Sequence, residues 1–210
     1  MNITSLRHRF TRHVEPVATL FVKIGLSPNR ITLLSLLFGV LCAWLYLRQM
    51  FVAGSLALVV SALLDLVDGA VARRTGQESR YGAVIDWIVD KYVDSLALLA
   101  IGLSGVPLLT RLFALDPRAD FAVAALAIIG SFMNTFIKPV TYAEIGFRDR
   151  TSGKIDDPLE GVGFFGRPET LLVLVAGGLT GLIWLSLLVV AVCTNISALQ
   201  RIAYLYRRYA

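Results

Sequence analysis

The chain has 210 residues, of which 56% are hydrophobic and only 17% are charged, and its mean hydropathy is +0.70. A soluble domain carries about 25% charged residues, so this composition argues against a soluble globular protein and indicates an integral membrane protein. The net charge of +5 comes from basic residues spread over the segments between apolar runs. This distribution suits contact with anionic lipid headgroups and gives no signal for nucleic-acid binding.

The N-terminal segment has the pattern of a helix at a membrane surface. Apolar residues recur at helical spacing over residues 3–21, with arginines and histidines between them. The pattern predicts an amphipathic helix in the interface, bent near Pro16, although an ordinary basic tail beside the membrane would explain it equally well. In the turn that follows, Pro28 is placed where it can open the next helix.

Six apolar runs follow, and each is close to the length of about 20 residues that spans a bilayer. They cover roughly residues 31–49, 52–72, 82–106, 120–143, 170–185 and 187–206. We therefore predict an all-α, polytopic membrane protein with six transmembrane helices. It forms a single domain over residues 1–210, with a juxtamembrane helix over residues 1–25 and a six-helix bundle over residues 31–206.

The positions of the basic residues predict the orientation in the membrane. Of the 20 Lys and Arg residues, sixteen lie before the first run, in or next to the second and fourth connections, or at the C-terminal end of the chain; Lys138 and Arg201 are counted there because each lies near the end of its run. The other side has only Arg48, Arg111 and Arg118, and Lys91 lies inside the third run. By the positive-inside rule, both termini and the second and fourth connections face the cytoplasm, and we expect the plasma membrane as the location.

Five aspartates interrupt the second and third apolar runs, at Asp65, Asp68, Asp86, Asp90 and Asp94. An ionisable group at bilayer depth costs about 2.5–3.5 kcal/mol on insertion scales, so such groups mark functional sites. The first two are three residues apart and share a helix face, and the other three form a stripe at a spacing of four. Since the two helices are antiparallel neighbours, four carboxylates can converge near their cytoplasmic ends. Such a group would suit two divalent cations that bridge a substrate phosphate.

Small residues and an arginine beside the acids indicate what the cations would hold. Gly69 and Gly82 let a ligand approach the backbone, Ala72 is also small, and Arg73 can meet a phosphate with its planar set of donors. This combination predicts a site for a nucleotide diphosphate. A buried ion-pair network is the alternative, but Arg73 and Lys91 would leave too much charge uncompensated in lipid.

The same residues carry a resemblance to a known family. The pattern Asp-x2-Asp-Gly-x2-Ala-Arg-x8-Gly-x3-Asp-x3-Asp, from Asp65 to Asp90, is similar to the signature of the CDP-alcohol phosphotransferases at all eight fixed positions. The six apolar runs, the N-terminal helix and the Ser27–Thr32 turn extend the resemblance over nearly the whole chain. It implies transfer of a phospho-alcohol group from a CDP-linked lipid donor to a small polar hydroxyl acceptor, with release of CMP, in phospholipid biosynthesis.

The resemblance also implies roles for individual residues. Two divalent cations, Mg²⁺ or Mn²⁺, would be held by Asp65, Asp68, Asp86 and Asp90. The last of these would also take the proton from the attacking hydroxyl. The residues implied for CDP binding are Asn29, Thr32, Gly69, Ala72, Arg73, Ser79 and Gly82. A homodimer surrounded by membrane lipids is expected from the same resemblance.

The residues after the motif bear on the acceptor. The run from Asp90 to Asp94 is similar to that of family members that use an inositol phosphate, and those members line a pocket with basic residues at places held here by Lys138, Arg167 and Arg201. Two of their arginines are absent, one shortly after Lys138 and one at Thr170. An inositol phosphate is our first choice, with glycerol 3-phosphate, serine or another polyol as alternatives.

Asp94 has two interpretations. It either orients the acceptor or only pairs with Lys91, and we prefer the first, because Lys91 can also extend towards the interface. Two other protein classes fit part of the pattern. An aspartate-rich prenyltransferase needs more spans and lacks the Gly-x2-Ala-Arg spacing. A cation carrier lined by acids remains open, although its acids would be expected across the bilayer rather than at one end.

Overall fold

The computed structural model describes residues 7–113, 115–116, 118–145, 150–151, 154–155, 159 and 161–209. Its helices are α1 (Arg7–Lys23), α2 (Pro28–Leu47), α3 (Phe51–Thr75), α4 (Arg80–Leu103), α5 (Arg118–Ile145), α6 (Arg167–Thr180) and α7 (Ile183–Tyr209). Two antiparallel strands of two residues each, β1 (Arg150–Thr151) and β2 (Lys154–Ile155), form a small hairpin between α5 and α6. Apart from this hairpin, the regular structure of the described residues is helical, as predicted. Residues 3–6 of the predicted N-terminal helix lie outside the described part.

The six helices after α1 lie where the sequence predicts the spans, but only four are simple candidates for crossing a membrane. By length and composition these are α2, α3, α5 and α7. Helix α4 carries five charged residues, and α6 has only 14 residues. At about 1.5 Å per residue, α6 is shorter than the roughly 30 Å of a hydrocarbon core. The protein is an integral membrane protein, and the count of six spans remains a prediction.

Local sequence explains where the helices near the acids begin and end. Pro28 starts α2, as predicted, because a proline at the first turn removes no helical hydrogen bond. Gly76 ends α3 in the left-handed conformation, at φ 64°. Ser79 then caps α4, where its side chain accepts a hydrogen bond from the backbone N–H of Gly82 at 2.9 Å. The connection between the two acidic helices is therefore short, so their aspartates stay close together.

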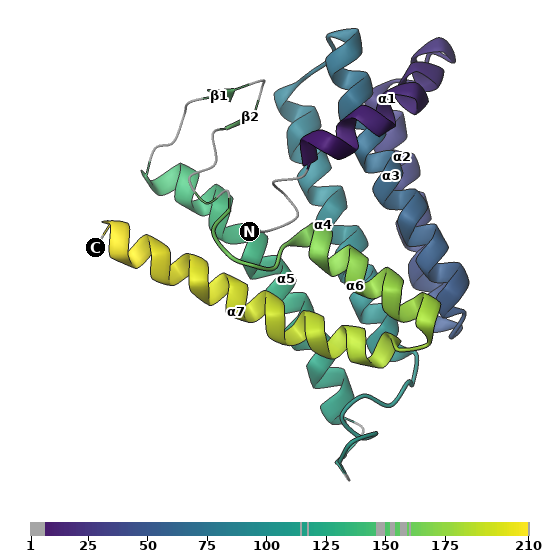
Figure 1. The fold of residues 1–210 in the computed structure, drawn as a ribbon, viewed down its shortest axis with the longest axis vertical. Helices are drawn as coiled ribbons and strands as arrows, with labels where there is room; N and C mark the ends of the chain where they lie inside the picture. Colours follow the sequence, from purple (N-terminus) through teal and green to yellow (C-terminus); the bar gives the residue numbers. More distant parts are fainter. Residues whose placement is uncertain are drawn as a thin grey trace.

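The helices pack as an antiparallel arrangement in which α2 packs against both α3 and α4, and α1 crosses the end where α3 finishes (Figure 1). The two acidic helices, expected from the sequence to be direct neighbours, are thus held together mainly through α2. Helices α5 and α7 pack against each other and extend away from that group towards the C-terminus. The start of α4 and the start of α6 lie towards the same end as the finish of α3. The chain thus brings three helix ends together around the predicted site.

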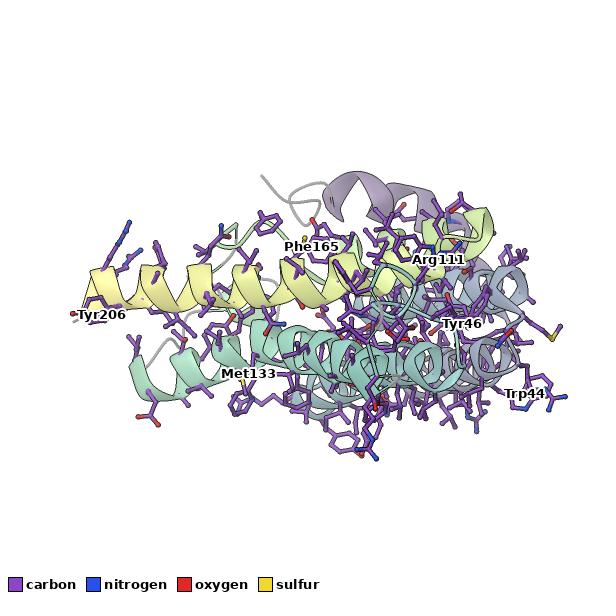
Figure 2. The ribbon with its side chains drawn as sticks, turned by 90° about the horizontal axis from the view of Figure 1, so that it is seen from below. Trp44, Tyr46, Arg111, Met133, Phe165 and Tyr206 are labelled. Carbon is purple, nitrogen blue, oxygen red and sulfur yellow. The ribbon has the colours of Figure 1, made fainter. Side chains whose placement is uncertain are left out.

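Apolar side chains face both inward and outward. Tyr46 is fully buried among the helices, whereas Trp44 is 54% exposed and Met133 is 45% exposed on the outer surface (Figure 2). Large exposed apolar side chains occur along all four candidate spans. A soluble protein would hide most of this surface, so the pattern fits helices that face lipid.

Buried serines join α2 to α3 just beyond the acids. Ser35 donates to the carbonyl of Ser61 at 2.9 Å, and Ser61 donates to the carbonyl of Ser35 at 2.8 Å. Interhelical hydrogen bonds of this kind satisfy hydroxyl groups that have no water to contact. They set the distance between the two helices one turn away from Thr32.

Candidate functional site

Three carboxylates form the centre of the candidate site. Asp65 and Asp68 come from the last part of α3, and Asp86 comes from the second turn of α4. One oxygen of each lies within 4.8 Å of an oxygen of the other two. Because the donors are oxygens alone, the group has the chemistry that Mg²⁺ and Mn²⁺ prefer and lacks the nitrogen and sulfur ligands typical of zinc.

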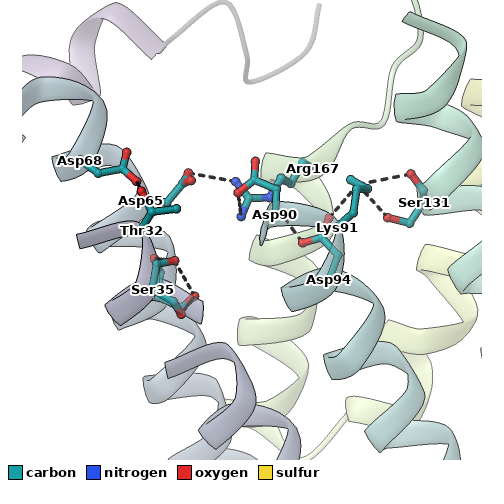
Figure 3. Close-up of polar contacts among 10 residues, drawn as sticks. Thr32, Ser35, Asp65, Asp68, Asp90, Lys91, Asp94, Ser131 and Arg167 are labelled. Carbon is teal, nitrogen blue, oxygen red and sulfur yellow. Dashed lines mark hydrogen bonds and ion pairs between the residues drawn. The ribbon is translucent and has the colours of Figure 1, made fainter. Parts of the chain in front are cut away.

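Asp68 is the most enclosed member of this group and is held by α2. Its side chain accepts a hydrogen bond from the Thr32 hydroxyl at 2.5 Å, and the residue is only 6% exposed (Figure 3). Thr32 also contacts the carbonyl of Pro28 at 3.1 Å. A buried carboxylate needs such partners, since it has little contact with water. Thr32, predicted to hold the CDP moiety, is therefore found as a donor to a candidate metal ligand.

Arg167 connects the acids of α3 and α4 through three different nitrogens. Its Nη1 lies 2.9 Å from Asp65 Oδ2, and its Nη2 lies 2.7 Å from Asp90 Oδ1. Its Nε lies 3.4 Å from Asp94 Oδ1. The Asp90 contact is an ion pair by distance, but it lacks the alignment of a hydrogen bond. The guanidinium thus supplies positive charge to three carboxylates at once (Figure 3).

The start of α6 fixes where Arg167 lies. Gly166 precedes the helix, and its backbone N–H donates to the Glu169 side chain at 2.9 Å. Pro168 occupies the first turn, where it stabilises a helix start. Glu169, the acid nearest to Arg167 in sequence, is therefore engaged in capping, and Arg167 turns to the aspartates of α3 and α4.

Asp94 pairs with Lys91, which is the interpretation that the sequence analysis placed second. Lys91 Nζ donates to Asp94 Oδ2 at 2.9 Å and also lies 3.4 Å from both the carbonyl and the hydroxyl of Ser131 on α5. Asp94 is 1% exposed. An acceptor arriving from water has almost no surface of Asp94 to contact. Asp94 also contacts Arg167, so it does not pair with Lys91 alone, and a role towards the acceptor stays a prediction.

The structure places the predicted metal ligands in two overlapping groups. Asp65, Asp68 and Asp86 share one cluster, and Asp90 lies in the ion-pair group around Arg167. Asp65 belongs to both. Arg73, one of the two bases that could have balanced the acids, is exposed, and Arg167 pairs with them instead.

The residues predicted to hold CDP lie at the neighbouring ends of α2, α3 and α4. A Cβ added to Gly82 would lie 3.0 Å from Ser79 Oγ and 3.9 Å from Asn29 Oδ1, so the starts of α2 and α4 are in contact distance. A Cβ on Gly69 would lie 3.3 Å from Arg73 Nη1. Ala72 is half-buried beside Arg73. Ser79 has a structural task as well, because it caps α4.

The three bases predicted to hold the acceptor have different surroundings. Arg167 contacts the aspartates. Arg201 is 5% exposed; its Nε donates to the carbonyl of Val162 at 2.9 Å, and its Nη1 donates to the carbonyl of Asn134. Lys138 is half-buried on α5. Arg201 therefore joins the segment before α6 to α5 and α7, a structural role that its position in the sequence did not indicate.

Comparison with known proteins gives the same family as the motif. The sequence model of CDP-alcohol phosphatidyltransferases matches residues 25–192. Archaetidylinositol phosphate synthase of Pyrococcus horikoshii is 26% identical over 201 residues, which are 95% of this chain and 94% of that protein. Phosphatidylinositol phosphate synthase of Corynebacterium glutamicum is 31% identical over 173 residues, which are 80% of this chain and 70% of that protein.

A solved structure shares the fold. The phosphatidylinositol phosphate synthase of Mycobacterium tuberculosis with CDP-DAG bound has a TM-score of 0.72 and 23% identity, and the match covers 93% of this chain and 94% of that one. The same Mycobacterium tuberculosis enzyme is also known in complex with manganese and citrate. The likeness extends over the described helices and establishes the fold that they form.

Proposed function

Because the chain belongs to the CDP-alcohol phosphatidyltransferase family, we propose that it transfers a phosphatidyl or archaetidyl group from a CDP-linked lipid to a hydroxyl acceptor. The observation that carries this proposal is the cluster of three carboxylates from Asp65, Asp68 and Asp86 within 4.8 Å. Such a cluster within apolar helices is costly unless a cation joins it, and a diphosphate donor needs cations.

We propose that Asp65, Asp68, Asp86 and Asp90 together hold two divalent cations, either Mg²⁺ or Mn²⁺. Three of these acids already lie close enough to share an ion, and Asp90 is joined to Asp65 through Arg167. When bound, such cations neutralise negative charge on the diphosphate and make CMP a better leaving group. Thr32 keeps the Asp68 carboxylate in place through its hydrogen bond.

Asp90 is our candidate for the general base. Its carboxylate is partly accessible, with 17% of the side chain exposed, whereas the Asp94 side chain has no exposure. In the proposed step, Asp90 takes the proton from the acceptor hydroxyl while that oxygen forms a bond to the lipid-side phosphorus of the diphosphate. The bond from this phosphorus to the bridging oxygen breaks, and CMP leaves with the electron pair. A carboxylate close to the reacting oxygen is suited to this role.

The donor would bind where α2, α3 and α4 end together. Gly69 and Gly82 leave the backbone open to approach, and Arg73 is exposed beside Gly69 with donors free to turn towards a phosphate. Asn29 lies near Gly82 and can contact the same ligand. We keep Ala72 and Ser79 in this donor site, although Ser79 also caps α4.

We propose an inositol phosphate as the acceptor. Two of the relatives named above are an archaetidylinositol phosphate synthase and a phosphatidylinositol phosphate synthase. By the family resemblance of the sequence, Lys138, Arg167 and Arg201 stand at places where members that use an inositol phosphate carry bases. Glycerol 3-phosphate, serine and other polyols remain candidates, because Arg201 is engaged with backbone carbonyls.

We further propose six spans in one domain, with α1 in the interface and both termini and the site on the cytoplasmic side of the plasma membrane. Asp68, Asp86 and Arg167 lie near the end of α3 and the starts of α4 and α6, which fits a lipid donor that enters from the leaflet and an acceptor that enters from water. We also propose a homodimer in the membrane, which the family resemblance of the sequence implies.

The test uses purified protein with CDP-diacylglycerol or CDP-archaeol, Mn²⁺ or Mg²⁺, and a panel of acceptors. We expect CMP release with inositol phosphate and a lipid product of the matching mass. CMP release with a different acceptor only would show that the proposed acceptor is wrong, whereas the proposed reaction would stand. If no acceptor releases CMP and the protein instead carries Mn²⁺ into liposomes, the transferase proposal fails in favour of a cation carrier.

A further inference from the structure

Asp94 is a buried carboxylate whose two oxygens face different basic residues. Its side chain has no exposure; Oδ2 lies 2.9 Å from Lys91 Nζ, and Oδ1 lies 3.4 Å from Arg167 Nε. A buried charge is tolerated when it is paired and hydrogen-bonded on several sides. With one oxygen towards each base and almost no surface, Asp94 is placed to act on its neighbours rather than on a substrate.

Arg167 contacts Asp94 through Nε and contacts Asp65 and Asp90 through its two terminal nitrogens. A guanidinium is planar and rigid, so fixing its Nε also fixes the directions of the two terminal nitrogens. Asp94 holds the Nε, and the terminal nitrogens then point to Asp65 and Asp90 (Figure 3). Those two residues are, respectively, a proposed metal ligand and the proposed base.

Lys91 supports this arrangement from the opposite side. Its Nζ contacts Asp94 and also reaches the Ser131 carbonyl and hydroxyl on α5, each at 3.4 Å. The lysine supplies a second positive charge beside the Asp94 carboxylate. Ser131 on α5 thus contacts Lys91, Lys91 contacts Asp94, and Asp94 contacts Arg167. The position of the Arg167 side chain therefore depends on residues of both α4 and α5.

We propose that Asp94 is a positioning residue: it orients Arg167 so that the two terminal nitrogens hold a substrate phosphate beside Asp90. The proposal rests on the proposed function, since it concerns how Arg167 meets a substrate. The phosphate belongs either to the acceptor or to the donor. A change in the KM of the acceptor would indicate the first, and a change in the KM of the CDP-lipid would indicate the second. Asp94 itself contacts neither substrate.

The test is a double-mutant cycle between Asp94→Asn and Arg167→Lys. Asparagine keeps the size of the side chain and removes its charge, and lysine keeps the positive charge but has no Nε in a planar group. We expect Asp94→Asn to raise the KM of the substrate that Arg167 holds by roughly tenfold or more, with kcat changed less than about threefold. In the Arg167→Lys background, Asp94→Asn should add little, because the group that it orients is gone.

A second readout does not depend on turnover. Phenylglyoxal modifies accessible arginines, and peptide mass spectrometry gives the extent of modification at Arg167. We expect several-fold faster modification in Asp94→Asn than in the parent. Asp120→Asn is the matched control, since Asp120 is also a buried aspartate but contacts Thr110, at 3.1 Å from its N–H. It should leave both readouts unchanged.

If Asp94→Asn does not fold, Asp94→Glu replaces it, because the added methylene displaces the oxygens while the charge stays. It should move both readouts in the same direction. Additive KM effects, or Arg167 modification that stays at the parental rate in both Asp94 variants, would overturn the positioning role. If the parent releases no CMP, the proposed function fails separately, and the modification rates still decide how Asp94 acts on Arg167.

Discussion

Replacing Thr32 by valine removes the hydroxyl that contacts Asp68 and leaves the volume of the side chain almost unchanged. The hydroxyl donates to Asp68 at 2.5 Å in a buried position. A hydrogen bond to an ionised group contributes about 1.5–3 kcal/mol. At about 1.4 kcal/mol per factor of ten, this predicts a rise of roughly 10–100-fold in the Mn²⁺ concentration needed for half-maximal activity. Loss of an outer partner of a metal ligand has effects of the same order.

The assay measures CMP release against Mn²⁺ concentration, together with the Mn²⁺-induced thermal shift in the absence of donor lipid. Thr32→Ser keeps the hydroxyl and should remain within about threefold of the parent. Ser35→Ala is a second control, because Ser35 is one turn along α2 and bonds to Ser61 instead of an acid. Equal Mn²⁺ dependence of the valine and serine variants would refute the reasoning about Asp68.

Three further outcomes follow from particular contacts. Arg167→Gln should lower the Mn²⁺ concentration at the thermal-shift midpoint by roughly tenfold, because the guanidinium 2.9 Å from Asp65 repels an incoming cation. Arg167→Lys keeps the positive charge and should leave that Mn²⁺ concentration unchanged. Gly178→Val should destabilise the fold by about 1–3 kcal/mol in chemical denaturation, since an added Cβ would lie 2.9 Å from the Phe51 carbonyl; Leu179→Val, at a residue 49% exposed, is the control. Chelation by EDTA should stop CMP release, and Mn²⁺ or Mg²⁺ should restore it; activity that persists after exhaustive chelation would contradict the metal site.

Much of the acidic cluster follows from local spacing. Asp65 and Asp68 are three residues apart on one helix, and the short connection through Gly76 and Ser79 starts the next helix at the same end. Helix α2 packs against both α3 and α4, and helical periodicity then directs Asp86 towards the acids of α3. The cluster of three was predictable for that reason, and the helix positions were predictable from the apolar runs.

The ion pairs of Arg167 were not predictable in this way. Arg167 and Asp65 are 102 residues apart, and Arg167 and Asp94 are 73 apart, so no periodicity relates them. Their meeting depends on how α6 packs against α3, which brings Arg167 within reach of α4. The local signal pointed elsewhere, because Glu169 is the nearest acid in sequence, and its capping of Gly166 becomes visible only with the helix start in view. The burial of Asp94 is likewise a result of packing.

The proposed role of Asp90 is tested most directly by CMP release from the Asp90→Asn variant, measured beside its binding of CDP-lipid. A general base contributes about 10²–10⁴-fold to a rate, so turnover should fall at least about 100-fold at saturating Mn²⁺. Binding of CDP-lipid should persist, because the other proposed ligands of the cations and of the CDP moiety are unchanged. CMP release at the parental rate by Asp90→Asn, with an acceptor that the parent uses, would contradict the proposed chemistry.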